Sequence, residues 1–374
     1  MFDNKKILIA AGGTGGHINP ALGTAGFIKE KHPSAEIAFV GTADKMEAKL
    51  VPQAGYELKT IEISGFWRSF SGEAIKHNIK TVKKLLKSSS QIKKIINDFK
   101  PDLVIGYGGY VSGPVLRIAA KMGIPTAIHE QNAYPGVANK AVAGKVDRVM
   151  LTAQQAEQYM NPKNPCVLTG LPIRGDILKG DRDFARAELN AGNKPLILSM
   201  GGSLGAKPVN DAVMGLILNK YKDNDCVFLH ATGKNAEGFI AELEEKGVDL
   251  KAYPNIKIVE YIDIPKCLAA ADLVICRSGA STLSELQALG RPSILIPSPY
   301  VTENHQYHNA MALVNNGAAE ILEEKDLTAD SLTERVNELL SDKAKLEEIG
   351  RNAKKMAVVD ATQRIYDTLS EIIK

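Results

Sequence analysis

Two glycine-rich turns occupy corresponding places in the two halves of this chain, and this repeat limits the possible folds more than any other feature. The turn Gly12–Gly16 follows an apolar run in the first half, and the turn Gly201–Gly205 follows a similar run in the second. The segment DLVIGYGG, which begins at Asp102, likewise corresponds to DLVICRSG, which begins at Asp272. Because the matching segments recur in the same order, the sequence predicts two similar α/β units, with a ligand that needs both halves bound in a cleft between them.

Length and composition are those of an ordinary two-domain globular protein. The chain has 374 residues, of which 24% are charged and 44% hydrophobic, and this length exceeds what one ordinary core organises. The net charge of +3 is too small to indicate a nucleic-acid partner. The four cysteines lack a paired spacing, which predicts reduced thiols rather than disulfides or a metal site. No apolar run approaches the roughly 18 residues of a membrane-spanning helix, so we expect any membrane contact to be peripheral.

Short β-branched runs alternate with helical patterns in both halves, as is typical of parallel sheets with right-handed helical crossovers. The stretch 161–176 carries three prolines between the halves, and we interpret it as the linker. We therefore expect domains at 1–163 and 164–374, with the last helix of the helical segment 332–374 a candidate to pack back on the first domain. Strands are expected at 7–10, 37–40, 103–105 and 126–128, and at 196–199, 227–230, 256–259, 273–275 and 293–296.

Each glycine-rich turn suits a phosphate group. Glycine lets the backbone approach an anion closely, and the start of the following helix offers unpaired N–H groups. We expect a helix to begin near Pro20 after the first turn, and the Ser203 hydroxyl to add a donor in the second. Neither turn matches a Walker motif or GxGxxG, and Asp44 fits only loosely the acidic position that a nicotinamide enzyme needs, which disfavours hydride transfer.

Polar side chains in the second half could bind a sugar nucleotide. Glu285 lies about one turn into a predicted helix, for which Ser278 and Ser281 are candidate caps. A carboxylate there can accept two hydrogen bonds from a ribose diol, or it can simply complement the helix dipole. The segment 301–310 is rich in groups that both donate and accept, which suits either sugar hydroxyls or an ordinary polar surface helix.

Eight collinear motifs resemble those of the MurG family, the N-acetylglucosaminyltransferases of bacterial peptidoglycan synthesis. They are GGTGGHINPA (12–21), GYGGYVSGP (106–114), HEQN (129–132), GLPIR (170–174), GGSLGA (201–206), YID (261–263), GASTLSE (279–285) and HQYHNA (305–310). The resemblance implies a GT-B fold, in which two Rossmann-like, doubly wound domains with parallel sheets face a deep cleft. It also implies inverting transfer of N-acetylglucosamine from UDP-N-acetylglucosamine to the C4 hydroxyl of the N-acetylmuramoyl residue of undecaprenyl-diphosphate-linked lipid I, forming lipid II.

The same resemblance assigns the donor mainly to the second domain. Ser203 and its loop would hold the diphosphate, and Ile262 would contact uracil through its backbone. Ala280, Ser281 and Thr282 would lie along the diphosphate and sugar. Glu285 would hold the ribose hydroxyls and Gln306 the sugar hydroxyls. Some family members carry paired glutamines where this chain has His305-Gln306, so the role of His305 stays open.

Residues of the linker and the first domain would complete the site. Arg174 and Asn132 would reach the donor, and Thr14, Gly15 and Gly16 would face the donor sugar or the acceptor diphosphate. His17 is the expected base for the acceptor hydroxyl, since histidine has a pKa near 6.5; its alternative role is to cap a helix or contact phosphate. Glu130 is the rival base. We expect no metal or other cofactor, with the helix start near Ser203 and the backbone donors near Ala280 stabilising the charge on the departing UDP.

A lysine-rich pattern in the first domain is the candidate membrane contact. Between residues 74 and 97 there are seven lysines and no acid, and apolar residues recur there at helical spacing. Phe66, Trp67, Arg68 and Phe70 lie just upstream. The pattern fits either a basic face on an anionic phospholipid surface or a domain helix with solvated lysines. With a membrane-bound acceptor, we expect a peripheral protein on the cytoplasmic face of the cell membrane, with other cell-wall synthesis and division proteins as candidate partners.

Two other functions remain open at this point. A nucleotide-sugar 2-epimerase also uses two Rossmann-like domains and would bind the same donor, but it would consume no lipid acceptor. A sugar-nucleotide-binding scaffold of the cell-wall machinery would bind without turnover. The presence of His17, Glu285 and Gln306 together speaks against the scaffold.

Overall fold

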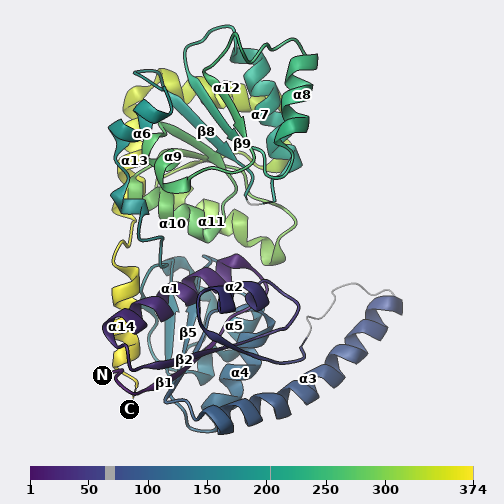
Figure 1. The fold of residues 1–374 in the computed structure, drawn as a ribbon, viewed down its shortest axis with the longest axis vertical. Coiled ribbons are helices and arrows are strands. Elements are labelled where there is room, and N and C mark those ends of the chain that lie inside the picture. The colour runs from purple at the N-terminus through teal and green to yellow at the C-terminus, as the bar shows by residue number, and fades with distance from the viewer. Residues whose placement is uncertain (64–71, 203, 374) are drawn as a thin grey trace. The chain divides into compact units, whose positions relative to one another are not determined.

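The computed structural model describes residues 1–63, 72–202 and 204–373 of the chain. Contacts within the chain divide it into two compact units (Figure 1). Unit 1 consists of Met1–Ile173 together with Val359–Lys374, and unit 2 is Arg174–Val358. Each unit contains a parallel sheet, as the alternation of apolar runs and helical patterns predicts.

The sheet of unit 1 has seven strands within the described residues, in the order β3-β2-β1-β4-β5-β6-β7. All its pairings are parallel: Ile7 of β1, for example, lies opposite Ile37 of β2 and Leu103 of β4. The strands are β1 (Lys6–Ala10), β2 (Glu36–Gly41), β3 (Glu57–Thr60), β4 (Leu103–Gly106), β5 (Thr126–Glu130), β6 (Arg148–Leu151) and β7 (Val167–Leu168).

Helices cover both faces of this sheet because its strands are apolar on both sides. In β1, Ile7 and Ile9 belong to one buried cluster, whereas Leu8 and Ala10 belong to another. The helices of unit 1 are α1 (Gly15–Lys31), α2 (Glu47–Gln53), α3 (Gly72–Phe99), α4 (Gly109–Lys121), α5 (Val137–Val142) and α14 (Ala361–Ser370).

Unit 2 repeats this arrangement with six strands among the residues described, in the order β10-β9-β8-β11-β12-β13. The strands are β8 (Leu196–Met200), β9 (Val227–Ala231), β10 (Ile256–Val259), β11 (Leu273–Cys276), β12 (Ser293–Leu295) and β13 (Glu320–Ile321). The helices are α6 (Arg182–Glu188), α7 (Lys207–Lys220), α8 (Ala236–Glu245), α9 (Ile264–Ala270), α10 (Ala280–Leu289), α11 (His305–Val314), α12 (Ala329–Ser341) and α13 (Lys343–Lys355). Since all pairings are parallel, the carboxyl ends of these strands share one edge of the sheet.

The C-terminal helix α14 belongs to unit 1, where it lies beside α1 (Figure 1). Its Ile365 and Leu369 are fully buried in the same cluster as Phe2. The Tyr366 hydroxyl lies 2.8 Å from Nε2 of His32, which follows α1. The chain therefore ends in the unit in which it began.

The structure differs from three expectations about local structure. The expected linker 161–176 contains β7, so the boundary between units falls at 173/174 and not at 163/164. The first glycine turn leads into α1 at Gly15, and Pro20 lies inside that helix. Gly279 occupies the N-cap position of α10 without a side-chain cap, so neither Ser278 nor Ser281 caps it.

The lysine-rich segment forms most of α3, a long helix that ends at Phe99 (Figure 1). Residues 64–71, and with them the aromatic group near Trp67, lie outside the described residues, as do the side chains of 74–86. In the described part of the chain, no helix combines the length and apolar character needed to cross a bilayer.

Candidate functional site

A hollow of about 390 Å³ lies at the carboxyl edge of the unit 2 sheet, and we call it the glycine-loop pocket. It brings together the turn after β8, the residues after β11 and β12, and the start of α11. Its lining consists of Gly201, Gly202, Leu204, Gly205, Ala206, Pro208, Arg277, Ser298, Tyr300, Gln306 and Glu324. The pocket thus joins the second glycine-rich turn to Gln306, two of the features predicted from the sequence to bind the donor.

The turn leaves no room for a side chain at Gly205. Gly205 has φ +74°, and a Cβ there would lie 2.2 Å from the carbonyl oxygen of Thr232. The Gly205 N–H donates to the Gly202 carbonyl at 2.9 Å, which closes the turn just before α7. Ser203, the predicted hydroxyl donor, lies outside the described residues. The remaining geometry directs the start of α7 toward the pocket, which suits an anionic group.

Gln306 lies at the start of α11 with its orientation fixed by backbone groups. Its side-chain oxygen accepts a hydrogen bond from the Ser298 N–H at 2.9 Å, and its backbone oxygen accepts one from the Ser278 hydroxyl at 2.8 Å. Because the oxygen of the amide is engaged, the NH₂ end supplies the donors for a ligand. The neighbouring His305 contacts the Thr302 carbonyl through Nδ1 at 2.8 Å, and burial lowers its pKa.

Glu285 and Arg174 form an ion pair. Arg174 Nε lies 3.2 Å from Glu285 Oε1; the carboxylate is nearly buried, whereas the guanidinium is about half exposed. Burial raises the pKa of Glu285, and the charge of Arg174 opposes that rise. The structure therefore brings together two residues that the sequence assigned separately, and Arg174 can hold the carboxylate in place.

The other expected donor residues of unit 2 lie along the same sheet edge but do not line the glycine-loop pocket. Ile262 is half-buried and follows β10 by three residues. Ala280, Ser281 and Thr282 form the first turn of α10, directly after β11 and Gly279. Their backbone N–H groups are those that a helix leaves unpaired at its start.

Arg277 and Glu324 line the pocket although sequence reasoning did not select them. Arg277 Nη2 pairs with Glu324, and Nη1 donates to the carbonyls of Ile296 and Pro297 at 3.1 and 3.2 Å. Arg277 directly follows β11, a position that could have identified it from the sequence. Glu324 is brought to the pocket from beyond β13 by the fold alone.

In unit 1 the first glycine turn positions His17. Its Nδ1 lies 3.0 Å from the Gly12 carbonyl oxygen and 3.3 Å from the Thr14 hydroxyl. Thr14 is the N-cap of α1 and is exposed, while Gly15 and Gly16 begin the helix. His17 therefore lies in the first turn of α1, with its ring held against the turn that precedes the helix.

Glu130 is held inside the loop that follows β5. It is 1% exposed, and its carboxylate accepts hydrogen bonds from the N–H groups of Asn132 and Gly136 at 2.9 and 3.0 Å. The side-chain amides of Asn132 and Asn139 add two more, at 3.2 and 2.7 Å. Burial raises the pKa of Glu130, and these hydrogen bonds oppose the rise. With its oxygens engaged in this way, Glu130 is suited to hold the loop and Asn132 rather than to accept a proton from an acceptor.

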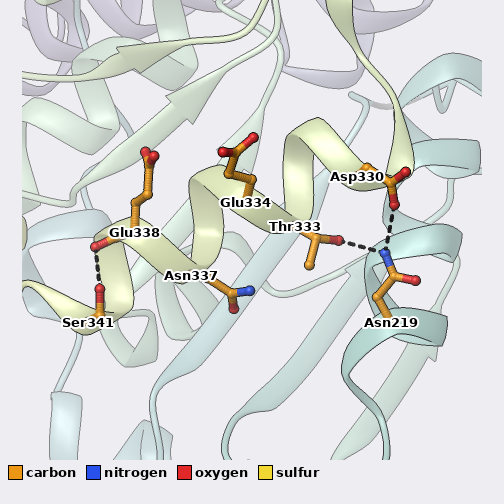
Figure 2. Close-up of a pocket in the computed structure, with 7 residues that line it drawn as sticks. All are labelled: Asn219, Asp330, Thr333, Glu334, Asn337, Glu338 and Ser341. Carbon is orange, nitrogen blue, oxygen red and sulfur yellow. Dashed lines mark hydrogen bonds between the residues drawn. The ribbon is translucent and has the colours of Figure 1, made fainter.

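A second hollow, of about 580 Å³, lies between α7 and α12 and contains none of the predicted site residues (Figure 2). Asn219 of α7 donates to Asp330 and Thr333 of α12 at 3.4 and 3.1 Å. These polar groups thus join the two helices, and we assign no ligand to this hollow.

The described residues contain no cluster of three or more His, Cys, Asp or Glu that could hold a metal ion. Two Asp-x-Asp sequences occur, at 181–183 and 223–225. Asp181 caps α6, and Asp223 and Asp225 pair with Lys220 at 3.6 and 3.2 Å. The four cysteines are free thiols, as their spacing predicts.

Comparison with protein families matches both units. Residues 7–151 match the glycosyltransferase family 28 N-terminal domain, and residues 196–365 match the glycosyltransferase family 28 C-terminal domain. Two curated relatives are named UDP-N-acetylglucosamine–N-acetylmuramyl-(pentapeptide) pyrophosphoryl-undecaprenol N-acetylglucosamine transferase. The one from Acetivibrio thermocellus is 46% identical over 99% of this chain and 98% of its own length. The one from Ruminiclostridium cellulolyticum is 44% identical over 98% of this chain and 100% of its own.

Solved structures support the same fold. Acinetobacter baumannii MurG matches with a TM-score of 0.79 and 28% identity, covering 98% of this chain and 99% of that one. A UDP-GlcNAc 2-epimerase from Neisseria meningitidis matches with a TM-score of 0.63 and 15% identity, covering 98% of this chain and 100% of that one. At that identity the epimerase shares the fold and gives no evidence about the reaction.

Proposed function

This chain belongs to the family of these N-acetylglucosamine transferases, and on that premise we propose how its residues carry out the transfer. It is a glycosyltransferase that moves N-acetylglucosamine from UDP-N-acetylglucosamine to lipid I, which forms lipid II for peptidoglycan synthesis. The observation that carries this conclusion is the 46% identity to a relative of that name, which extends over 99% of this chain. The glycine-loop pocket supports it, because a turn rich in backbone N–H groups meets a fixed amide there, as a sugar diphosphate requires.

We propose that unit 2 binds the donor. The turn Gly201–Ala206 and the first turn of α7 hold the diphosphate, with Ser203 as an added donor. Glu285, oriented by Arg174, accepts hydrogen bonds from the ribose hydroxyls, and Gln306 donates to the sugar. The backbone of Ile262 contacts uracil, and the first turn of α10 lies along the diphosphate and sugar.

The reaction needs a base and a stabilised leaving group. His17 Nε2 takes the proton of the C4 hydroxyl while that oxygen bonds to the anomeric carbon from the side opposite UDP. The anomeric carbon–oxygen bond breaks, and UDP leaves with the electron pair. The helix starts of α7 and α10 stabilise the charge that builds on the diphosphate. Thr14, Gly15 and Gly16 contact the acceptor diphosphate or the donor sugar, and the loop that Glu130 holds presents Asn132 to the donor.

We also propose that the protein works peripherally at the cytoplasmic face of the cell membrane, because its acceptor is anchored there. The lysine-rich segment 74–97 would rest on anionic phospholipid. Flotation with vesicles of neutral lipid and of anionic lipid tests this point: binding that ignores lipid charge would remove the electrostatic contribution. Cell-wall synthesis and division proteins are the candidate partners.

Transfer of labelled N-acetylglucosamine from its UDP form to a short-chain lipid I analogue tests the function. We expect label in the lipid product without added metal, and a loss of at least about a hundredfold in kcat for His17→Ala with donor affinity retained. Donor binding without transfer, followed by release of an epimerised sugar, would instead establish an epimerase. Equal losses of kcat and donor affinity in the variant would remove His17 from the role of base.

A further inference from the structure

Glu47, the first residue of α2, is a fully buried acid that turns toward the first glycine turn. Its Oε2 accepts a hydrogen bond from the Gly13 N–H at 2.9 Å. Its Oε1 accepts two from Thr42, at 3.0 Å from the backbone N–H and at 2.8 Å from the hydroxyl. A carboxylate accepts at both oxygens, so this set of donors suits the ionised side chain.

The chain makes room for this carboxylate with glycines. A Cβ on Gly12 would lie 2.8 Å from Glu47 Oε1, and a Cβ on Gly41 would lie 2.6 Å from Glu47 Cγ. Burying a carboxylate is costly unless it is fully hydrogen-bonded. Its position behind the turn is therefore a specific feature of the fold rather than a surface charge that happens to fall there.

The hydrogen bonds of Glu47 and of His17 meet on one peptide group. The N–H of Gly13 and the C=O of Gly12 belong to the same peptide; the first donates to Glu47, and the second lies 3.0 Å from His17 Nδ1. A carbonyl can only accept, so Nδ1 carries the proton and the lone pair of the neutral ring is on Nε2. The carboxylate, the peptide and the imidazole are therefore linked in series by hydrogen bonds.

We propose that Glu47 is a positioning residue that acts on His17 through the Gly12–Gly13 peptide. Its negative charge polarises the peptide and makes the Gly12 carbonyl a stronger acceptor, which favours the Nδ1–H tautomer and the imidazolium that forms when Nε2 gains a proton. An aspartate performs this task by direct contact in a Ser-His-Asp triad. No proton moves between the three groups, and Nδ1 keeps its hydrogen throughout. The consequence for catalysis rests on the proposed function, whereas the effect on His17 does not.

The loop between β4 and α4 fixes both the ring and the peptide. A Cβ on Gly108 would lie 2.8 Å from Cδ2 of His17, and a Cβ on Gly109 would lie 2.4 Å from the Gly12 carbonyl oxygen. Both glycines have positive φ, +98° and +78°. The loop therefore packs closely against both the ring and its carbonyl partner, and an effect that acts through a single peptide needs such fixed geometry.

Other titratable groups on these elements do not replace Glu47. Tyr107 and Tyr110 flank the glycines of the β4–α4 loop; tyrosine is neutral at neutral pH, and burial raises the pKa of Tyr107 further. Asp44 and Lys45 precede α2, are exposed, and lie 3.8 Å from each other, so their charges largely offset. In the first glycine turn and α1, His17 is the one titratable side chain between residues 12 and 28, and Lys29 is the next.

The first test follows His17 directly by NMR of ¹⁵N-histidine-labelled protein without substrates. The unmodified chain should show the proton on Nδ1 at pH 8; a ring protonated on Nε2 instead would overturn the proposal without any variant. In Glu47→Gln the side chain keeps its size but loses its charge. We expect the pKa of His17 to fall by about half a unit or more, which is at least a threefold change in its protonation equilibrium. An unchanged pKa with an unchanged tautomer would also overturn the proposal.

The second test uses the transfer reaction. Glu47→Gln should lower kcat by about tenfold to a hundredfold, which is part of the roughly 10²–10⁴-fold contribution of a general base. It should also move the acidic limb of the pH–rate profile to lower pH, because the pKa of His17 falls. Binding of UDP, which unit 2 provides, should stay the same. Glu36→Gln is the matched control, because Glu36 is an exposed acid on β2 that pairs with Lys6 at 2.8 Å; it should change neither reading. If the unmodified chain transfers no sugar, the proposed function fails. The NMR result still decides whether Glu47 acts on His17 through the Gly12–Gly13 peptide.

Discussion

Acidic side chains in this protein have roles that depend on which donors face them. Glu130 and Glu47 are both buried, and each accepts hydrogen bonds from backbone N–H groups of a site loop. Glu285 instead faces the Arg174 side chain, which leaves oxygen lone pairs for a ligand. The residue type is the same in all three places, and the number of internal donors separates the two loop-holding carboxylates from Glu285, which we propose to bind the donor.

Glu285→Gln should weaken UDP binding. The substitution removes the charge that strengthens hydrogen bonds to the ribose, and such bonds contribute about 1.5–3 kcal/mol, so Kd should rise about tenfold to a hundredfold. Isothermal titration calorimetry with UDP measures the change. Glu244→Gln, an exposed acid on α8, is the matched control and should bind UDP as the unmodified protein does. Equal affinity for all three proteins would remove Glu285 from the donor site.

At the scale of elements, both units place a glycine turn between a central strand and a helix. In unit 2 the turn after β8 packs on the residues after β9: Gly205 meets the Thr232 carbonyl, and a Cβ on Gly233 would lie 2.5 Å from the Gly205 nitrogen. In unit 1 the turn after β1 packs on the residues after β4. Each turn therefore keeps its shape through a second turn at the same sheet edge.

Gly205→Ala should disrupt the glycine-loop pocket. The new Cβ would meet backbone at 2.2 Å, so the turn must move, and we expect UDP affinity to fall by at least about tenfold, or 1.4 kcal/mol. Gly247→Ala is the matched control, since Gly247 also has positive φ, +91°, but has no neighbour within 4 Å of a Cβ. Both variants carry the strain of about 1–2 kcal/mol for a left-handed alanine. Similar UDP affinity in the two variants would show that close packing at Gly205 does not matter for binding.

At the scale of the whole molecule, each unit contains one fully buried histidine among the side chains that the structure describes. His129 of unit 1 and His230 of unit 2 are 0% exposed, and burial lowers the pKa of each to about 4. His129 Nε2 donates to the Gly170 carbonyl at 2.8 Å, and His230 Nδ1 lies 2.9 Å from the Ser199 hydroxyl. Protonation of either ring places an extra charge in a core.

Both units should therefore lose stability in acid. The folded pKa lies below the unfolded value of about 6.5, so stability is fully present above pH 6.5 and falls as the pH drops toward 4. Between pH 7.5 and 5 each histidine should cost about 2 kcal/mol of unfolding free energy. Urea unfolding at the two pH values measures this.

His129→Gln should reduce the acid-dependent loss of unfolding free energy in unit 1, even if the variant is less stable than the unmodified protein at both pH values. His230→Gln should do the same for unit 2. If neither substitution reduces the loss of stability in acid, groups other than these two histidines cause that loss.

The sequence by itself determined the two α/β units, because apolar periodicity and glycine turns are local signals that parallel sheets require. All nine strands expected from it are present within a residue or two. It did not reveal the short strands β3, β6, β7 and β13, which lie toward sheet edges where burial leaves a weaker pattern. Eight motifs also identified the family, and the curated relatives confirm it.

Only the tertiary structure decided which side chains meet. The ion pair of Glu285 with Arg174, and the enclosure of Glu130 by Asn132 and Asn139, join residues whose spacing along the chain carries no such information. Glu47 lacked any sequence signal, since it reaches the first glycine turn through the packing of α2 against the edge of the sheet. Periodicity fixes which face of an element is buried; the contacts of a buried polar group depend on the partners that the fold places within hydrogen-bonding distance.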